Sequence, residues 1–194
     1  MDYSKCAGTI PEEVLRHPVA GINIKGPTFA DELGAEPTYA VFLRHLGCVF
    51  CRQLVDELRL TTEQRSDFPP VIIFYQGTTE QGEQFFQKKW PTARAIADLS
   101  TTFYKGFHLK RGSFSQMFGA RVWASGIRAI SKGFRPGKVI GDPWMMPGIF
   151  LIEGSRIAWL HAFRHAGDHP ALQQLPTTMK EAATAYNLEM STSV

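Results

Sequence analysis

Residues Tyr39 to Arg59 read YAVFLRHLGCVFCRQLVDELR and are the most informative part of the chain for its fold. Residues 38–45 follow a proline and are rich in aromatic and aliphatic side chains, which predicts a strand. Gly47 then predicts a tight turn. After the turn, apolar residues recur at i, i+3, i+4 and i+7, with charged residues on the opposite face, at Cys51, Leu54, Val55 and Leu58. This spacing predicts a helix that buries one stripe.

Cys48 falls at the start of this predicted helix. Free backbone N–H groups and the positive end of the helix dipole favour a thiolate there, which is the reactive form of cysteine. Arg44, His45 and Arg52 are close in sequence and can lower the pKa of this thiol below its free value of about 8.5. Cys51, one turn on, is expected to face back toward Cys48. Two sulfurs so placed can cycle between dithiol and disulfide.

The composition favours one soluble domain. The chain has 194 residues, of which 44% are hydrophobic, so one sizeable core is expected. The apolar runs have the length of strands, and the first residues lack a signal-peptide core, so we expect no membrane span and a cytoplasmic location. Three cysteines are too few for a secreted disulfide scaffold, whereas Cys-x-x-Cys beside a βαβ pattern indicates redox chemistry. Cys6 is left over and is predicted to be a bystander.

The charges are unevenly distributed, although the net charge is only +3. The segment between Leu99 and Gly141 has no acidic residue and eight basic ones, namely Lys105, Lys110, Arg111, Arg121, Arg128, Lys132, Arg135 and Lys138. Such a segment can attract an acidic ligand, an anionic lipid or nucleic acid. No nucleic-acid motif accompanies it, so we expect no nucleic-acid partner and favour a solvated helix face or a subunit contact, as in a homodimer.

The order of predicted elements indicates an α/β protein. Residues 1–37 are interpreted as an N-terminal extension with one possible hairpin, and residues 38–194 as the main domain. The helix that carries the cysteines is expected to end near Leu60, and later elements are expected as strands at 70–75, 94–98, 146–152 and 156–163 and helices at 80–90, 113–131 and 178–188. The helix at 113–131 is an insertion before the C-terminal hairpin, and its apolar stripe is expected to pack on the sheet. A four- or five-stranded mixed sheet flanked by helices accommodates this order.

The Cys-x-x-Cys at the first helix and the Met146-Pro147 pair that opens the hairpin together resemble the thioredoxin fold. In that fold the peptide bond before the corresponding proline is cis and lies against the redox cysteines. The resemblance implies a cis bond at Pro147, which would leave the backbone of Met146 free to pair with an extended thiol partner. Trp144 and the two methionines after it can wall an apolar substrate pocket or belong to the core.

The string FLRHLGCVFCR at residues 42–52 resembles the peroxiredoxin-like branch of the AhpC/TSA antioxidant family, which is related to selenoprotein U and prostamide/prostaglandin F synthase. The resemblance extends over residues 22–170 and implies that Cys48 is the attacking thiol and Cys51 the resolving one. Ordinary peroxiredoxins have a threonine at the position of His45. They also have an arginine that steadies the peroxide, for which this chain offers four candidates, Arg44, Arg52, Arg121 and Arg128.

Metal chemistry is not expected. A zinc site needs four ligands, and no second Cys-x-x-Cys exists. His161, His165 and His169 are four residues apart, but the first lies in a predicted strand, and a glycine and a proline interrupt the rest. We therefore expect neither a metal nor another cofactor. For His45, two roles remain open: a proton shuttle or positive neighbour of Cys48, and a strand-end residue in solvent.

The leading hypothesis is a thiol-dependent oxidoreductase that reduces hydroperoxides or another small oxidant. In this hypothesis Cys48 becomes a sulfenic acid, Cys51 condenses with it to form a disulfide, and an external thiol such as thioredoxin or glutathione resets the pair. The predicted catalytic residues are Cys48, Cys51, His45 and Arg52, and the predicted substrate contacts are Arg44, Trp144, Met146 and Pro147. Two alternatives are a thioredoxin-like disulfide reductase and a non-catalytic binding protein with a vestigial cysteine pair.

Overall fold

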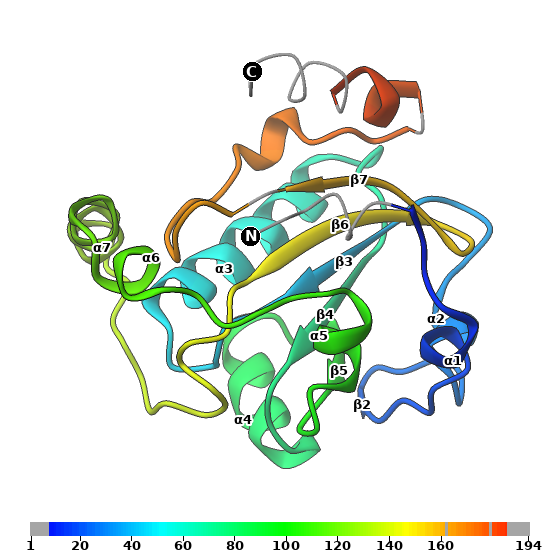
Figure 1. The fold of residues 1–194 in the computed structure, drawn as a ribbon, viewed down its shortest axis with the longest axis horizontal. Coiled ribbons are helices and arrows are strands. Elements are labelled where there is room, and N and C mark those ends of the chain that lie inside the picture. Colours follow the sequence, from blue (N-terminus) through cyan, green and yellow to red (C-terminus); the bar gives the residue numbers. More distant parts are fainter. Residues whose placement is uncertain (1–7, 162, 179, 186–194) are drawn as a thin grey trace.

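The computed structural model describes residues 8–161, 163–178 and 180–185. In this part of the chain a seven-stranded mixed sheet, ordered β1-β7-β6-β3-β4-β5-β2, has helices on both faces (Figure 1). The strands are β1 (Gly8–Thr9), β2 (Gly21–Ile22), β3 (Thr38–Phe42), β4 (Val71–Tyr75), β5 (Arg94–Ala97), β6 (Gly148–Glu153) and β7 (Arg156–His161). The helices are α1 (Glu12–Leu15), α2 (Phe29–Glu32), α3 (Val49–Gln64), α4 (Thr79–Lys89), α5 (Thr102–Gly106), α6 (Phe114–Phe118) and α7 (Ala120–Ser131), and a 3-10 turn spans Leu172–Gln174. The predicted mixed sheet flanked by helices is confirmed, but it has seven strands rather than the four or five expected.

Strand β3 lies in the middle of the sheet, parallel to β4 and antiparallel to β6. Tyr39 and Val41 belong to one hydrophobic cluster, and Ala40 and Phe42 belong to the cluster on the other face. Successive strand residues point to opposite faces, and both faces of this sheet are covered, so all four are buried. The central strand therefore leads the chain directly from the core into the turn that carries the cysteines.

Helix α3 connects the parallel strands β3 and β4 and buries the predicted stripe. Its buried residues include Cys51, Leu54, Val55 and Leu58. The helix runs on to Gln64, so residues 61–64, beyond the expected end near Leu60, are helical. The hairpin of β6 and β7 is also confirmed, because these strands pair antiparallel around a turn at 154–155.

The N-terminal segment widens the sheet at both edges. β1 pairs with β7, and β2 pairs with β5 at the opposite edge. Residues 21–22 thus supply an edge strand, and the feature nearest to the expected hairpin is an antiparallel bridge between Pro18 and Thr28. The carboxylate of Glu32 is buried, accepts two backbone N–H groups of the preceding loop and pairs with Arg94 of β5. These contacts attach the segment to the sheet.

The insertion differs most from its prediction. It forms two helices that separate at Gly119, where the backbone is extended. Most of the apolar stripe faces solvent, with exposed fractions of 51–72% at Phe114, Phe118, Trp123, Ile127 and Ile130. The prediction that this stripe packs on the sheet is wrong. Helix α7 packs on α3 instead, and its buried residues include the smaller Val122, Ser125 and Ala129, which allow a close approach that the larger side chains would prevent.

Two predictions concern the ends of the chain. Cys6 lies outside the described residues, as does the expected end of the last helix near Leu188. The start of that helix is described, and there the Glu181 N–H donates to the Thr178 hydroxyl at 3.2 Å, which caps the helix. A search of the described helices for one long and apolar enough to cross a membrane found none.

Candidate active site

Cys48 is the N-cap residue of α3. Its N–H donates to the carbonyl of His45, and its own carbonyl accepts the first helical hydrogen bond from Arg52, both at 3.0 Å. The preceding Gly47 has no room for a side chain, because the backbone at 137–138 lies against it and the Gly137 N–H donates to its carbonyl at 2.9 Å. The predicted position of Cys48 at the helix start is confirmed.

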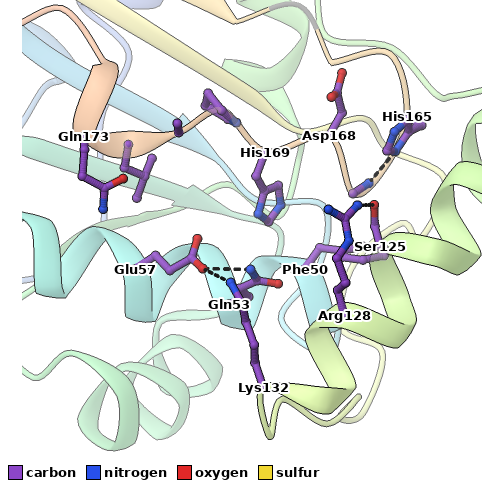
Figure 2. Close-up of a pocket in the computed structure, with 14 residues that line it drawn as sticks. Phe50, Gln53, Glu57, Ser125, Arg128, Lys132, His165, Asp168, His169 and Gln173 are labelled. Carbon is purple, nitrogen blue, oxygen red and sulfur yellow. Dashed lines mark hydrogen bonds and ion pairs between the residues drawn. The ribbon is translucent and has the colours of Figure 1, made fainter.

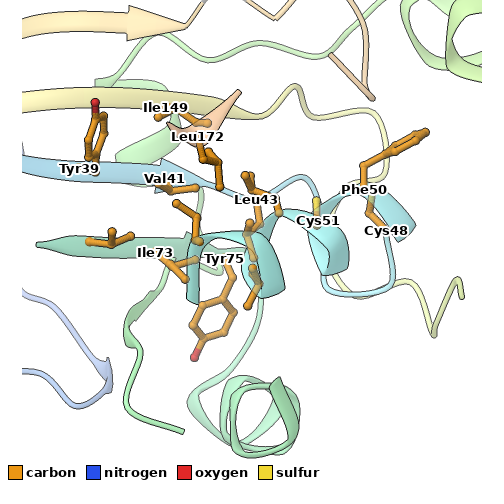
Figure 3. Packing of buried hydrophobic residues seen from close by; sticks show 14 of the residues in the cluster. Tyr39, Val41, Leu43, Cys48, Phe50, Cys51, Ile73, Tyr75, Ile149 and Leu172 are labelled. Carbon is orange, nitrogen blue, oxygen red and sulfur yellow. The ribbon is translucent and has the colours of Figure 1, made fainter. Parts of the chain in front are cut away.

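The two cysteines lie together in the first turn of α3, next to the core (Figure 3). The thiol of Cys51 donates a hydrogen bond to the Cys48 sulfur, and Cys51 Sγ accepts the backbone N–H of Arg44 at 3.3 Å. Both are free thiols, with exposed fractions of 4% for Cys48 and 2% for Cys51. The expectation that Cys51 faces back toward Cys48 is confirmed.

Arg44 is the arginine that the fold brings to the sulfur. One guanidinium nitrogen, Nη1, lies 3.6 Å from Cys48 Sγ, and the other, Nη2, donates to the carbonyl of Pro143. The side chain is 9% exposed, so its charge is weakly screened. The guanidinium of Arg52 lies over the ring of Phe85 instead, 5.7 Å from the ring centroid.

The remaining candidate arginines belong to α7. Arg128 donates to the Ser125 hydroxyl at 3.3 Å and lines the cavity described below, and Arg121 is exposed. Among the four arginines that the sequence left open, the contact at 3.6 Å therefore favours Arg44 as the partner of Cys48.

The two thiols are electrostatically different. The hydrogen bond from Cys51, followed by the positive charge of Arg44 and the N–H groups of Cys51 and Phe50, lowers the pKa of Cys48 from 9.0 to about 6 against the opposing effect of burial. Burial, and then the hydrogen bond to Cys48 and its negative charge, raise the pKa of Cys51 well above 9.0. At neutral pH the site therefore holds one thiolate beside one protonated thiol, which is the arrangement of a nucleophile and a resolving partner.

His45 is buried rather than exposed at a strand end. Burial, and then the charge of Arg44, lower the pKa of His45 to about 4, so the ring is neutral at neutral pH. It therefore does not supply positive charge to Cys48. A proton-shuttle role stays a prediction.

Gln76 completes the site and was missed by the sequence analysis. Its Nε2 donates to the carbonyl of Arg44 at 2.6 Å, and its Oε1 accepts the N–H of Asp142 at 3.0 Å. Gly141 has a φ of 98°, and a side chain there would collide with Gln76. This buried amide thus joins the cysteine turn to the loop at 141–143. In the sequence, Gln76 is only a glutamine directly after an apolar strand, and this position does not predict which groups it contacts.

The backbone expectations for Met146 and Pro147 need correction. No peptide bond in the described part of the chain is cis, so the cis bond expected at Pro147 is wrong. The N–H of Met146 is also not free, because it donates to the carbonyl of Lys110 at 3.0 Å. Met146 and Pro147 are buried, and Trp144 is half-buried beside the ring of Phe118. The segment that leads into the insertion pairs with this backbone, and substrate contact by Trp144, Met146 and Pro147 stays a prediction.

A cavity of about 570 Å³ lies beside α3, between α7 and residues 165–173 (Figure 2). Phe50, two positions after Cys48, forms part of its wall, but neither cysteine is among the described residues that line it. Of its two histidines among the described residues, His165 accepts the N–H of Gly167 through Nδ1 at 3.2 Å, and His169 packs edge-on against the ring of Phe50. In the described ranges, no three His, Cys, Asp or Glu side chains are grouped as a metal site would require.

Comparison with known proteins places the chain in a family. Residues 57–165 match the model of a family described as AhpC/TSA antioxidant enzyme. The chain belongs to the AhpC/TSA antioxidant enzyme family. The matched residues begin within α3 after both cysteines, so this assignment is independent of the Cys-x-x-Cys motif. Among curated proteins, none matches the sequence.

Solved structures of peroxiredoxins share the fold of this family member. Peroxiredoxin Q from Xanthomonas campestris has 10% identity over 92% of this chain and 94% of its own, with a TM-score of 0.59. Peroxidoxin BcpB from Mycobacterium tuberculosis has 12% identity over 94% and 98%, with a TM-score of 0.58. A PrxQ mutant from Xylella fastidiosa has 16% identity over 94% of both chains, with a TM-score of 0.53. The predicted thioredoxin-like fold is confirmed.

Proposed function

We propose that this member of the AhpC/TSA family is a thiol peroxidase in which Cys48 reduces hydroperoxides and Cys51 resolves the product. One observation carries the proposal. The sulfur of Cys48 lies at a helix start, 3.6 Å from the Arg44 guanidinium, and accepts a hydrogen bond from the Cys51 thiol. The three groups supply a nucleophile, a positive charge and a second sulfur within reach.

In the first step the Cys48 thiolate attacks the terminal oxygen of a hydroperoxide. The S–O bond forms as the O–O bond breaks, so the peroxide is reduced by two electrons and the sulfur becomes a sulfenic acid. The departing alkoxide takes a proton from water, since the His45 ring, with a pKa of about 4, is neutral and a weak proton donor at neutral pH. The fixed charge of Arg44 stabilises the anionic sulfur and the oxygen on which charge develops.

In the second step Cys51 attacks the sulfenic sulfur. An S–S bond forms, the S–O bond breaks, and the hydroxyl leaves as water with the proton of Cys51. The raised pKa of Cys51 keeps that proton in place until then. An external thiol, such as thioredoxin or glutathione, then reduces the disulfide by exchange.

The enclosure of the site favours peroxide over protein disulfides as the oxidant. Cys48 is buried, and the loop after α7 covers its turn through the hydrogen bonds of Gly137 to Gly47 and of Arg44 to Pro143. A small peroxide needs less displacement of this loop than an extended peptide does. The N–H of Met146 is in addition already paired with Lys110. A disulfide reductase is therefore the less well supported alternative.

The test is peroxide-dependent oxidation of NADPH coupled through thioredoxin reductase and thioredoxin. We expect Cys48→Ser to abolish turnover, because the hydroxyl is not ionised at neutral pH. Cys51→Ser should retain one turnover and accumulate a sulfenic acid at Cys48, which dimedone labels. Cys6→Ser is the matched control and should turn over at the wild-type rate.

Three outcomes contradict the proposal. A Cys48→Ser variant with an unchanged rate removes Cys48 from the reaction. Insulin reduction that needs Cys48, without any peroxide turnover, assigns the disulfide-reductase alternative. If neither assay responds and dimedone labels nothing, the cysteine pair is vestigial.

A further inference from the structure

The insertion carries a group of large apolar side chains that the protein does not bury. We define the α6–α7 face as Phe114, Phe118, Trp123, Ile127 and Ile130, all of which are at least half exposed. The last three recur in α7 at i, i+4 and i+7 and so lie on one side of that helix. A soluble surface rarely groups so many large apolar side chains without a partner.

The outward direction of this face follows from how α7 is held. Val122, Ser125 and Ala129 are buried and fix the other side of the helix to the protein, next to α3. Figure 1 shows α7 at the margin of the molecule, away from the sheet. The apolar side of α7 is therefore turned away from the core.

The charge distribution indicates what the face meets. Residues 99–141 contain eight Lys and Arg and no Asp or Glu, while the rest of the chain has thirteen basic and eighteen acidic residues, a formal charge of −5. Arg111 pairs with Asp142 and Lys132 with Glu57, so the positive charge of this segment is carried mainly by the other six basic residues, among them the exposed Arg121, Arg135 and Lys138. An anionic surface attracts this segment and repels the remainder, which orients the protein before contact.

We propose that the α6–α7 face docks on the surface of a lipid bilayer that contains anionic lipids. A helix with Trp and Ile on one side and Lys or Arg on another is typical of segments that lie in the membrane interface. Trp123 is a residue type that is common at the membrane interface, because its ring has an apolar body and a polar N–H. At twelve residues α7 is too short to cross a bilayer and would lie along it. The proposal goes beyond the thiol chemistry and does not depend on it.

A second copy of the chain is a poorer occupant. Two-fold symmetric contact through this face would bring the two positive segments together. Juxtaposed like charges oppose such an interface. Arg135 and Lys138, in the loop after α7, are both exposed and would add to this repulsion. Charge complementarity therefore favours the anionic bilayer.

The test is co-sedimentation of the full chain with phosphatidylcholine vesicles that either lack or contain phosphatidylserine. We expect binding only when phosphatidylserine is present, a decrease with added salt, and a blue shift of tryptophan emission on binding. The variant with Trp123→Ser, Ile127→Gln and Ile130→Gln should bind about tenfold or more weakly. The control is Leu60→Gln with Leu99→Gln, which removes exposed leucines outside the face and should bind normally.

A second pair of variants tests the charges. Arg135→Gln with Lys138→Gln should weaken binding by roughly tenfold or more, since each basic residue near an anionic surface contributes. The matched control is Lys25→Gln with Lys88→Gln, which removes the same charge from exposed sites elsewhere and should have little effect. Circular dichroism should show that all four variants keep the wild-type fold.

Four outcomes overturn the proposal. The first is a wild-type chain that stays in the supernatant with phosphatidylserine vesicles. The second is an equal loss of binding in the control variants. The third is a wild-type dimer by sedimentation velocity that the apolar variant converts to monomer, which would assign the face to a second copy. The fourth is binding to soluble polyglutamate that is as tight as binding to vesicles and is unchanged in the apolar variant. That result would mean that charge alone drives binding and would indicate an acidic protein partner.

Discussion

Helices α3 and α7 are both amphipathic and pack on each other. They differ in which of their side chains are buried. α3 buries its large apolar residues, including Leu54 and Leu58, against the sheet. α7 buries small residues and leaves Trp123 and Ile127 in solvent. An apolar stripe therefore predicts that one side of a helix is kept from water, but it does not predict which structure covers that side. The sheet covers the stripe of α3, and we propose that a membrane covers that of α7.

The basic residues near the two helices differ in the same way. Arg44, just before α3, is buried and directed at one sulfur atom, so its charge acts on chemistry. The basic residues in and after α7, such as Arg121 and Lys138, are exposed, so their charges act together at longer range. The buried charge of Arg44 can therefore lower the pKa of Cys48, whereas the exposed charges can act on a negatively charged partner.

The apolar stripes of α3 and α7 should differ in how much they contribute to stability. Leu54→Ala should lower the free energy of unfolding by about 2–5 kcal/mol, because it leaves a cavity under α3. Ile127→Ala should change it by less than about 0.5 kcal/mol, because that side chain is exposed on α7. Urea unfolding followed by circular dichroism measures both. A large loss for Ile127→Ala would mean that the protein itself covers the α6–α7 face.

The next effect concerns the cysteine pair at the start of α3. Cys51→Ala should raise the pKa of Cys48 by about one to two units, since it removes the hydrogen bond that lowers that pKa most. Cys51→Ser, which keeps a donor, should shift it less. The thiolate fraction falls as pH decreases through the pKa, so a raised pKa moves the profile of alkylation rate to higher pH. Iodoacetamide labelling across pH measures the midpoint, and identical midpoints for the two variants would contradict the hydrogen bond.

Arg44 and Arg52 should differ in how much they lower the pKa of Cys48. Arg44→Gln should raise the pKa of Cys48 by about one unit and slow peroxide turnover about tenfold at a pH below the new midpoint. Arg52→Gln should shift the midpoint less, because that guanidinium lies over Phe85. The same alkylation profile and the coupled peroxide assay measure both variants. If Arg52→Gln gave the larger shift, Arg44 would not be the partner of Cys48.

Local patterns in the sequence predicted those parts of the site that lie within a single strand or helix. The run before Gly47 predicted β3, and the spacing from Cys51 to Leu58 predicted α3, because periodicity directly reports burial in a strand or helix. Placing Cys48 at the helix start and Cys51 one turn later then followed from helix geometry. The choice of Arg44 among four arginines did not follow, because contact with the sulfur depends on the path of the loop between β3 and α3.

The sequence could not predict the contacts made between distant elements. Gln76 joins Arg44 to Asp142 across separate loops, and Lys110 pairs with the backbone of Met146. Both contacts depend on how the insertion is placed beside the sheet.

By itself, the sequence determined the α/β order, the two adjacent sulfurs and the concentration of positive charge in one segment, since each is a property of neighbouring residues. The tertiary structure alone decided that Arg44 contacts Cys48, that Pro147 follows a trans bond and that the apolar side of α7 faces outward. The reason is physical. Which side chain meets which, and which face remains in water, depends on the relative position of elements that are far apart in the chain.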